Sequence, residues 1–284
     1  MSKYFNSIVT CHRSRRLALR AFLKAFSLAA PYVGKDTFEI VITDMDESSD
    51  SLISRYSDIL NINLCKVKYD GPFCRAKALN HAVLNAQGKY VTPIDIDAIV
   101  TKHFLPHISD FYSQIETKES KLCHRIRSLD VSTSCHFWFS NFDEKAVDLL
   151  VESHDKFPIN RERYTEKEVV YTGGDIKESW MDGAALGTSQ FTMLRDIFML
   201  LGGYDENFIG RGCQDLDFNL RAFRFMGGGY LGPDPKFSLY HLANSNNPKD
   251  YATNEIMKNN YDRYISNKQN NVISIPISST WGIF

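Results

Sequence analysis

Two acidic residues separated by one apolar residue, Asp95 and Asp97, are the strongest chemical signal in the sequence. They follow a strand-like run, residues 89–94, and so lie where a β-strand gives way to a loop. In open α/β sheets, ligands bind at that edge. Carboxylate oxygens suit Mg²⁺ or Mn²⁺, and these ions usually keep coordination positions for a substrate's phosphate oxygens. The pair therefore predicts a site for a metal diphosphate, although many Asp-x-Asp sequences are only solvated loops.

A basic turn upstream of this pair carries the opposite charge. Arg75 and Lys77 lie at the start of a predicted helix and could neutralise nucleotide phosphates at the same edge of the sheet. Asp44 and Asp46 end the second predicted strand, where a carboxylate could accept the imide N–H of uracil. The alternative interpretations are a solvated basic turn and an acidic turn that caps the next helix.

A glycine-rich connection, residues 202–212, leads into a helix whose first turn contains Asp215 and Asp217. A carboxylate there can face a cleft and take a proton from a sugar hydroxyl that lies within about 3 Å. Residues two apart on a helix point to different sides, so only one of the pair is expected to be catalytic. Both acids can also complement the positive end of the helix. His241 ends an extended stretch and could give the metal an imidazole ligand, although most lone histidines are not ligands.

The overall charge is balanced, with 33 basic and 34 acidic residues and a formal net charge of −1. Such a chain offers no broad attraction for a nucleic-acid backbone, so no nucleic-acid partner is expected. Residues 12–16 form a local basic cluster, in which Arg13 is nearest the sheet edge. This cluster could touch a diphosphate or an anionic membrane surface, or it could form the solvated face of the first helix.

The elements that must position these residues alternate between strands and helices in the first hundred residues, which is typical of parallel strands bridged by helices. Strands are predicted over residues 5–10, 39–43, 63–68 and 89–94. Helices are predicted from Ser14, as the cap, to just before Pro31, and over residues 51–60 and 76–86. The result is an α/β fold with a mixed, mostly parallel sheet flanked by helices.

The rest of the chain is less regular. From residue 118 to 171 the alternation is lost, and this part is expected to wrap one side of the sheet. Helical patterns return over residues 193–201 and 214–225, and Gly227 is expected to end the second. Residues 246–284 form an extension, helical around residues 251–264, whose apolar end, 273–284, is expected to be a strand or flap packed on the body.

Several motifs are missing from the sequence. It contains no Gly-x-x-x-x-Gly-Lys-Ser/Thr loop, no Gly-x-Gly-x-x-Gly after the first strand and no Gly-x-Ser-x-Gly elbow. P-loop NTPases, dinucleotide oxidoreductases and serine hydrolases are therefore not favoured. The six cysteines form no Cys-x-x-Cys pair and indicate the reduced thiols of a cytoplasmic protein. No run approaches the roughly 18 apolar residues of a membrane span, and no classical secretion signal is expected.

Taken together and in this order, the motifs resemble a GT-A fold glycosyltransferase of the family-2 type, near the chondroitin-polymerase and β-1,4-galactosyltransferase-like branch. The likeness spans about residues 5–242. The matching segments are Val9-Thr-Cys-His-Arg13, Ile42-Thr-Asp-Met-Asp-Glu-Ser-Ser-Asp50, Arg75-Ala-Lys-Ala-Leu-Asn80, Gly88-Lys-Tyr-Val91, Asp95-Ile-Asp97, Gly202-Gly-Tyr-Asp-Glu-Asn-Phe208, Gly210-Arg-Gly-Cys-Gln-Asp-Leu-Asp217 and His241.

The resemblance implies a division of the chain and a role for each matching residue. A GT-A, Rossmann-like catalytic domain would cover residues 1–245, with a nucleotide-binding half (1–117), an acceptor-binding half (118–245) and the extension 246–284. The nucleotide would contact Thr10, Arg13, Asp44 or Asp46, Arg75, Lys77 and Asp95. A metal cofactor, Mn²⁺ or Mg²⁺, would bind Asp97 and His241, with Asp95 on the metal or the ribose. Asp215 would be the catalytic base.

The sequence also departs from the family pattern. Met45 separates two acids that are usually adjacent, which leaves open whether Asp44 or Asp46 meets uracil. In the later motif Arg211 replaces a tryptophan and Gln214 replaces a glutamate. Trp180 is expected to replace the missing tryptophan. The residues expected to contact the acceptor or donor sugar are Trp180, Asp182, Gly183 and Gln214.

The implied activity is inverting, metal-dependent transfer of a hexose or N-acetylhexosamine from a UDP-sugar donor to a hydroxyl of a glycan or lipid-linked glycan acceptor. The implied setting is synthesis of a bacterial surface polysaccharide, capsule or O-antigen, in the cytoplasm at the inner face of the membrane, with peripheral membrane association. The alternatives are a retaining glycosyltransferase, a sugar nucleotidyltransferase, and a non-catalytic subunit that binds sugar nucleotides or polysaccharide.

Overall fold

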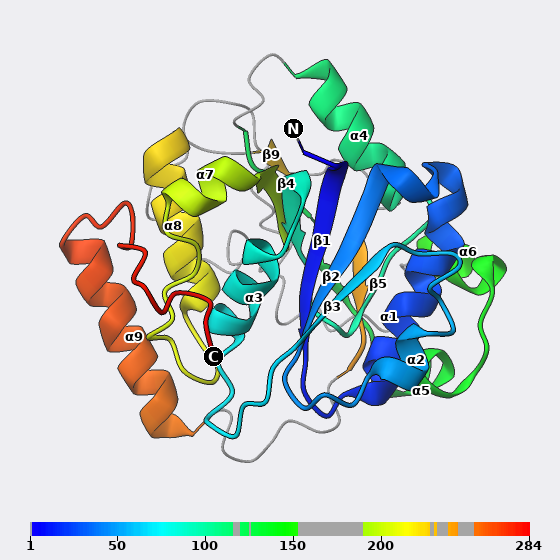
Figure 1. Ribbon diagram of the computed structural model, residues 1–284, viewed down its shortest axis with the longest axis horizontal. Coiled ribbons are helices and arrows are strands. Elements are labelled where there is room, and N and C mark those ends of the chain that lie inside the picture. Colours follow the sequence, from blue (N-terminus) through cyan, green and yellow to red (C-terminus); the bar gives the residue numbers. More distant parts are fainter. Residues whose placement is uncertain are drawn as a thin grey trace.

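The computed structural model describes residues 2–115, 120–124, 126–152, 190–227, 230–231, 238–243 and 253–284. The predicted sugar contacts Trp180, Asp182 and Gly183 lie outside these described residues. The described part of the chain folds around a seven-stranded sheet with helices on both faces (Figure 1).

Four parallel strands form one half of this sheet, as the alternating sequence pattern predicts. β1 (Tyr4–His12) lies between β2 (Phe38–Asp44) and β4 (Gly88–Pro93), and β3 (Ile62–Lys66) pairs with the far side of β2. All residues of β2 and all but the first two of β1 are buried. Such burial on both faces is expected for parallel strands that helices cover on either side.

The other half of the sheet is mixed. β8 (Phe191–Leu194) pairs antiparallel with β4 and with β6 (Leu122–Cys123). β9 (Tyr230–Leu231) then pairs parallel with β6 and completes the order β3-β2-β1-β4-β8-β6-β9. The predicted α/β fold with a mixed, mostly parallel sheet is therefore confirmed.

A second, three-stranded sheet lies after β4 in the chain. Its central strand, β10 (Leu239–His241), pairs antiparallel with β5 (Ala98–Ile99) and parallel with β7 (Ile126–Ser128). This small sheet joins the chain just after Asp97 to a segment more than a hundred residues further on. Its consequence for the site is described below.

The helices follow the strands in the order that the sequence predicts, with some differences in length. They are α1 (Arg16–Ala29), α2 (Asp50–Ile53), α3 (Arg75–Leu84), α4 (Phe104–Gln114), α5 (Val131–Phe139), α6 (Glu144–Glu152), α7 (Arg195–Leu200), α8 (Gln214–Met226) and α9 (Asn254–Gln269), with the short 3₁₀ turns η1 (Ala30–Tyr32) and η2 (Lys35–Thr37). Figure 1 shows α1, α5 and α6 on one side of β1–β3, and α3, α7, α8 and α9 on the other.

Alternation along the strands decides which helix covers which face. Ile8 belongs to the core that contains α1, whereas the next residue, Val9, belongs to the core that contains α3. The same holds in β2 for Ile40 and Val41. Successive strand residues point to opposite faces, so a slip of one residue would exchange the two cores.

Three local predictions are corrected by the structure. Ser14 does not cap α1: the helix follows Arg15, and Ser14 has a φ of 55°. The helix expected over residues 51–60 ends at Ile53, because serine hydroxyls beyond it donate to carbonyls three residues back and compete with helical bonding. Residues 131–139 are helical, because Asp130 accepts the N–H of Thr133 at 2.8 Å and caps α5.

The C-terminal residues 253–284 pack on the body of the protein. Thr253 caps α9, and Tyr264 of α9 packs with Phe208 and Leu220 near α8. The chain then runs back across the body as a segment without strand pairing, residues 272–284, which we call the strap. Trp281 in the strap is buried. The predicted helix is confirmed, and the apolar end is a flap on the body.

None of the described helices combines the length and the apolar character that crossing a membrane requires.

Candidate active site

The two acids of the Asp-x-Asp pair and His241 are brought together by the small sheet. Asp95 and Asp97 follow β4, and β10 places His241 opposite Ala98, directly after Asp97. The N–H of Leu242 donates to the carbonyl of Asp97 at 2.8 Å. One ligand atom from each of Asp95, Asp97 and His241 lies within 4.8 Å of the others. We call these three residues the metal cluster.

The donor atoms of the metal cluster fit a divalent cation. Nε2 of His241 lies 3.0 Å from Oδ1 of Asp97. That Oδ1 atom is buried and makes no aligned hydrogen bond within the described part of the chain. A buried oxygen in this state is a group that a cation would satisfy. Two carboxylates and one imidazole suit Mn²⁺ and, with more water in the coordination sphere, Mg²⁺.

The charges around Asp97 keep it ionised. Burial by itself would raise the pKa of Asp97, but His241 and Arg15 outweigh this and lower the pKa to about 2. Arg15 donates from Nη1 to Oδ2 of Asp97 at 2.8 Å. Burial by itself would lower the pKa of His241, but Asp97 raises it above its ordinary value. A cation and a proton therefore compete for His241.

Arg75 joins the metal cluster to the predicted base. Its Nε and Nη2 atoms lie 2.8 and 2.7 Å from Oδ1 of Asp95, and its Nη1 donates to Oδ1 of Asp215 at 2.9 Å. The guanidinium is buried and lies over the ring of Tyr204, with Cζ 5.6 Å from the centroid. The first turns of α3 and α8 thus meet at one side chain. An arginine expected to bind phosphate thus contacts two carboxylates.

Asp215 lies in the first turn of α8, against Arg75. Burial raises the pKa of Asp215, and the Asp95 charge adds to the rise, while Arg75 opposes it. Its neighbour two residues on, Asp217, points elsewhere and is buried in an ion pair with Arg221, Nε to Oδ2 at 2.8 Å. The structure thus separates the two acids, as expected for residues two apart on a helix. Gln214, also predicted at the site, is buried.

Sequence analysis missed a lysine behind Asp215. Lys121 is buried, contacts the side-chain oxygen of Asn219, and lies 4.4 Å from the ring centroid of Phe191. Burial lowers the pKa of Lys121. Its charge acts on Asp215 in the same direction as that of Arg75, favouring the ionised carboxylate.

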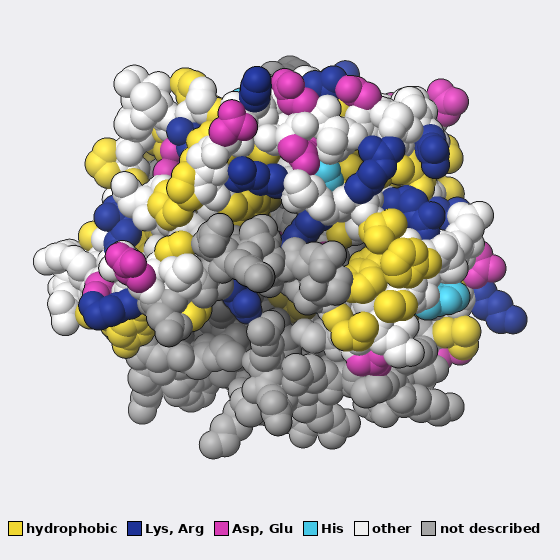
Figure 2. Space-filling view, turned by 90° about the horizontal axis from the view of Figure 1, so that it is seen from below, with side chains coloured by type: hydrophobic (Ala, Val, Ile, Leu, Met, Phe, Trp, Pro, Cys, Tyr) yellow, Lys and Arg dark blue, Asp and Glu magenta, His cyan; other side chains and the backbone are white. Residues whose placement is uncertain are grey.

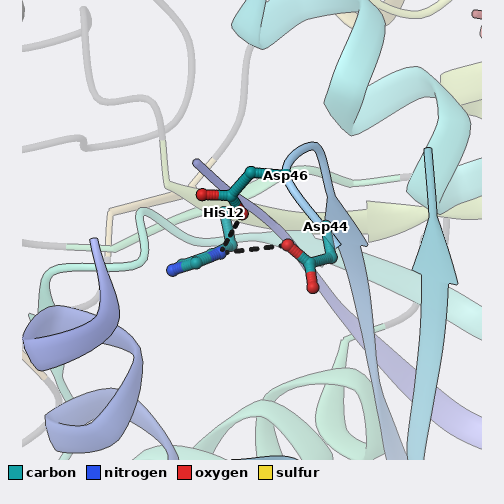
Figure 3. A group of neighbouring side chains, drawn as sticks. All are labelled: His12, Asp44 and Asp46. Carbon is teal, nitrogen blue, oxygen red and sulfur yellow. Dashed lines mark hydrogen bonds and ion pairs between the residues drawn. The ribbon is translucent and has the colours of Figure 1, made fainter. Parts of the chain in front are cut away.

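A second cluster lies where β1 and β2 end (Figure 3). Nδ1 of His12 is 3.1 Å from Oδ1 of Asp44 and 3.3 Å from Oδ1 of Asp46. The N–H of Ser14 donates to Oδ2 of Asp46 at 2.7 Å, which explains why Ser14 is not available to α1, and the N–H of Ser49 donates to Oδ2 of Asp44 at 3.0 Å. We call His12, Asp44 and Asp46 the turn cluster.

The two acids of the turn cluster differ in access. The Asp44 side chain is fully buried, whereas 27% of the Asp46 side chain is exposed. Burial would raise the pKa of Asp44, but hydrogen bonds from His12 and Ser49 lower it well below its ordinary value. Asp46 is therefore the acid that a ligand can reach, and Asp44 is the one that holds the turn.

The remaining predicted nucleotide contacts lie beside aromatic rings. Arg13 donates from Nη1 to the carbonyl of Gly71 at 2.8 Å, and its Cζ lies 5.9 Å from the ring centroid of Tyr69. Nζ of Lys77 lies 5.2 Å from the ring centroid of Phe284. Thr10 is buried. Figure 2 views the side on which β1 and β2 end, where acidic and basic side chains are interspersed and no single sign of charge dominates.

Of the missed residues His12 and Arg15, the first had a signal in the sequence and the second did not. His12 is the register partner of Asp44 in the parallel pairing of β1 and β2, and Arg15 follows three residues later. Lining up the ends of the two predicted strands would have placed His12 beside Asp44. Nothing comparable in the sequence indicates that Arg15 reaches Asp97.

Residues 27–228 match the sequence model of the family described as glycosyltransferase-like family 2. The chain belongs to this family. The predicted resemblance to a family-2 glycosyltransferase is thereby confirmed. The chondroitin-polymerase and galactosyltransferase-like branch stays a prediction.

Solved structures share the fold of this glycosyltransferase. TarS residues 1–349 of S. aureus, in complex with UDP-GlcNAc, superposes with a TM-score of 0.59 at 12% identity over 87% of this chain and 61% of that one. The mannosyltransferase PcManGT of Pyrobaculum calidifontis, with GDP-Man and Mn²⁺, gives a TM-score of 0.56 at 14% identity over 98% of this chain and 67% of that one. The chain spans 61% of the first of these structures and 37% of the longer TarS structure. No curated protein matches it.

Proposed function

We propose that this glycosyltransferase moves a hexose or N-acetylhexosamine from a UDP-sugar to a hydroxyl of a glycan acceptor, with inversion at the anomeric carbon. The observation that carries the proposal is the guanidinium of Arg75, which joins Asp95 of the metal cluster to Asp215. Arg75 would thus connect the part of the site where the leaving group departs with the part where the acceptor proton is taken. That is the arrangement an in-line displacement needs.

The metal cluster would hold the cofactor, Mn²⁺ or Mg²⁺, through Asp97 and His241, with Asp95 on the metal or the ribose. When bound, the ion would supply positive charge for the departing diphosphate. Arg15 keeps Asp97 ionised and correctly oriented through its 2.8 Å bond to Oδ2. The Mn²⁺ printed for the archaeal mannosyltransferase supports a divalent ion on this fold.

The nucleotide would lie across the ends of β1 and β2. Asp46 is the exposed acid there and would accept the imide N–H of the base, while the buried Asp44 orients the turn. Thr10, Arg13 and Lys77 would contact the ribose and phosphates. Arg75, whose guanidinium contacts Asp95 and Asp215, would contact a phosphate or the ribose from that position.

Asp215 would take the proton from the acceptor hydroxyl. Its pKa is raised by burial and by Asp95, and a base works best when its pKa is near the working pH. Gln214, Trp180, Asp182 and Gly183 would contact the donor or acceptor sugar. The acceptor would be a glycan or lipid-linked glycan of a capsule or O-antigen, met at the inner face of the membrane by a catalytic domain of residues 1–245.

Titration of the purified protein with UDP, UDP-sugars and GDP-mannose, with and without Mn²⁺, tests the donor and the metal together. We expect UDP to bind more tightly with Mn²⁺, and the α-linked donor to give a β-linked product by NMR. A retained anomeric configuration would point to a retaining transferase, and pyrophosphate released from a nucleoside triphosphate would point to a nucleotidyltransferase. Binding without any turnover or donor hydrolysis would indicate a non-catalytic subunit.

A further inference from the structure

The strap is held on the body by hydrogen bonds up to residue 282. The N–H of Ile275 donates to the carbonyl of Leu201 at 3.0 Å, and Nε1 of Trp281 donates to the carbonyl of Gly202 at 2.8 Å. The N–H of Gly282 then donates to Oε1 of Glu206 at 2.6 Å. These anchors fix the direction in which the chain leaves residue 282.

Two glycines of the family motif make room for the strap. Gly202 and Gly203 have positive φ angles, 78° and 61°. A Cβ at Gly202 would overlap the backbone of Ile275, and a Cβ at Gly203 would lie 2.5 Å from the ring of Trp281. The backbone of the strap can lie this close only because both positions lack a side chain. The strap is thus a fitted part of the body.

Beyond the anchors, Phe284 lies beside the ends of β1 and β2, on the side of these strands that α3 covers. It packs in one apolar cluster with Cys11, Met45 and Ala78. Met45 stands between Asp44 and Asp46, and Cys11 precedes His12. The ring of Phe284 meets the ring of Tyr69 edge-on, with centroids 4.9 Å apart and planes at 64°. Both rings are half-buried, so part of each remains open to a ligand.

The groups gathered here match the chemistry of a nucleoside diphosphate. Tyr69 and Phe284 offer aromatic surface, Asp46 offers a reachable hydrogen-bond acceptor, and each ring carries a cation, Arg13 over Tyr69 and Lys77 over Phe284. Stacking of a base on an aromatic side chain contributes about 1–3 kcal/mol. The inference rests on the proposed UDP-sugar donor and adds the residues that recognise its base.

We propose that the strap completes the nucleobase pocket, with Phe284 and Tyr69 as the aromatic wall beside the acceptor carboxylate of Asp46. Phe284 would then bind the donor together with β1 and β2, from which it is far apart in the sequence. It acts on the base and leaves the metal cluster unchanged.

The test compares Phe284→Leu and Phe284→Ala with Ile283→Ala, whose residue is 53% exposed and outside the apolar cluster. Leucine keeps the apolar packing and removes the π-face. We expect Phe284→Ala to weaken UDP and uridine binding by about 5- to 100-fold, the factor that corresponds to lost stacking, and Phe284→Leu to weaken both to a smaller extent. Calorimetric affinity for inorganic pyrophosphate with Mn²⁺ should not change, and Phe284→Trp should retain UDP affinity.

The outcomes separate this inference from the proposed function. If the wild-type protein binds UDP and both Phe284 variants bind it equally well, the proposed aromatic wall is contradicted and the proposed UDP-sugar donor is not. The wall is also wrong if UDP and pyrophosphate affinity fall together, because Phe284 would then act on the whole site. If the wild-type protein binds no UDP with Mn²⁺, both proposals fail. Thermal unfolding of each variant checks that Phe284→Leu, at least, is folded.

Discussion

Two clusters of one histidine and two aspartates lie at the same edge of the sheet, and they differ in what their oxygens already bind. In the turn cluster, backbone N–H groups of Ser14 and Ser49 donate to Asp46 and Asp44, and His12 is fully buried. In the metal cluster, Oδ1 of Asp97 makes no aligned hydrogen bond among the described residues, and 20% of the His241 side chain is exposed. From residue types alone, both clusters would be interpreted as metal sites. The exposure of the imidazole and the unused carboxylate oxygen distinguish them.

The largest expected effect concerns the base that stands beside the metal cluster. Asp215→Asn should lower turnover by about 10²- to 10⁴-fold while UDP and Mn²⁺ binding are retained, because a positioned base is removed and the shape of the pocket is kept. Steady-state kinetics with calorimetric binding measure this. Asp217→Asn is the matched control: it breaks the buried pair with Arg221 and should cost stability. Near-normal turnover in Asp215→Asn would remove Asp215 from the mechanism.

The comparison of the two clusters is tested directly by Asp97→Asn and Asp44→Asn. Asp97→Asn should weaken Mn²⁺ binding by at least about 100-fold, since even residues outside the ligand shell are worth 10- to 100-fold. Asp44→Asn should leave Mn²⁺ affinity unchanged and lower the free energy of unfolding by about 1–3 kcal/mol, because buried donors lose a charged acceptor. Calorimetry and chemical unfolding report the two quantities. Loss of Mn²⁺ binding in Asp44→Asn alone would reverse the assignment.

The pH dependence should follow Asp215. Its pKa is raised, so the base form is lost at a higher pH than for an ordinary aspartate, and kcat/KM should fall on the acid side of neutrality. Lys121→Met removes a positive charge that favours ionised Asp215, and so the acid limb should move to still higher pH with the plateau little changed. A pH–rate profile of both proteins measures the shift. If the acid limb of the pH–rate profile does not move in Lys121→Met, then Lys121 has only a packing role.

The smallest expected effect is that of loosening the strap, which lies on the same side of the site as the turn cluster. Gly202→Ala should destabilise the protein by about 1–3 kcal/mol and weaken UDP binding a few-fold, because the new methyl overlaps Ile275 and loosens the strap. Gly227→Ala is the control, since Gly227 also has a positive φ but open space around it. It should cost about 1 kcal/mol, from backbone strain only. Unchanged Mn²⁺ affinity in both variants would confirm that the strap serves the nucleotide side.

The sequence pattern located the strands because it alternates between the period of a strand and the period of a helix. Acids at the ends of two strands, Asp44 in β2 and Asp95 after β4, supported this prediction. It placed Asp95, Asp97 and His241 together through the family resemblance, since nothing local shows that β10 pairs with β5. It did not show the partners of Arg75: a basic residue at a helix start predicts a phosphate contact, and only the fold shows that two carboxylates also contact it. Ser14 was misjudged for the same reason, because a serine's partner can be distant in the chain.

The pairing of β10 with β5 and β7 has a consequence for how such enzymes diversify. The backbone pairing of Leu239–His241 positions the imidazole of His241 beside Asp97, whatever the length of the chain between them. Loops of the intervening sequence that carry neither a strand of the two sheets nor a residue of the site can therefore be exchanged, lengthened or grafted from a relative, provided that both ends of this small sheet are kept. Redesign of acceptor choice is best begun there, with the cation's coordination left as a fixed part of the scaffold.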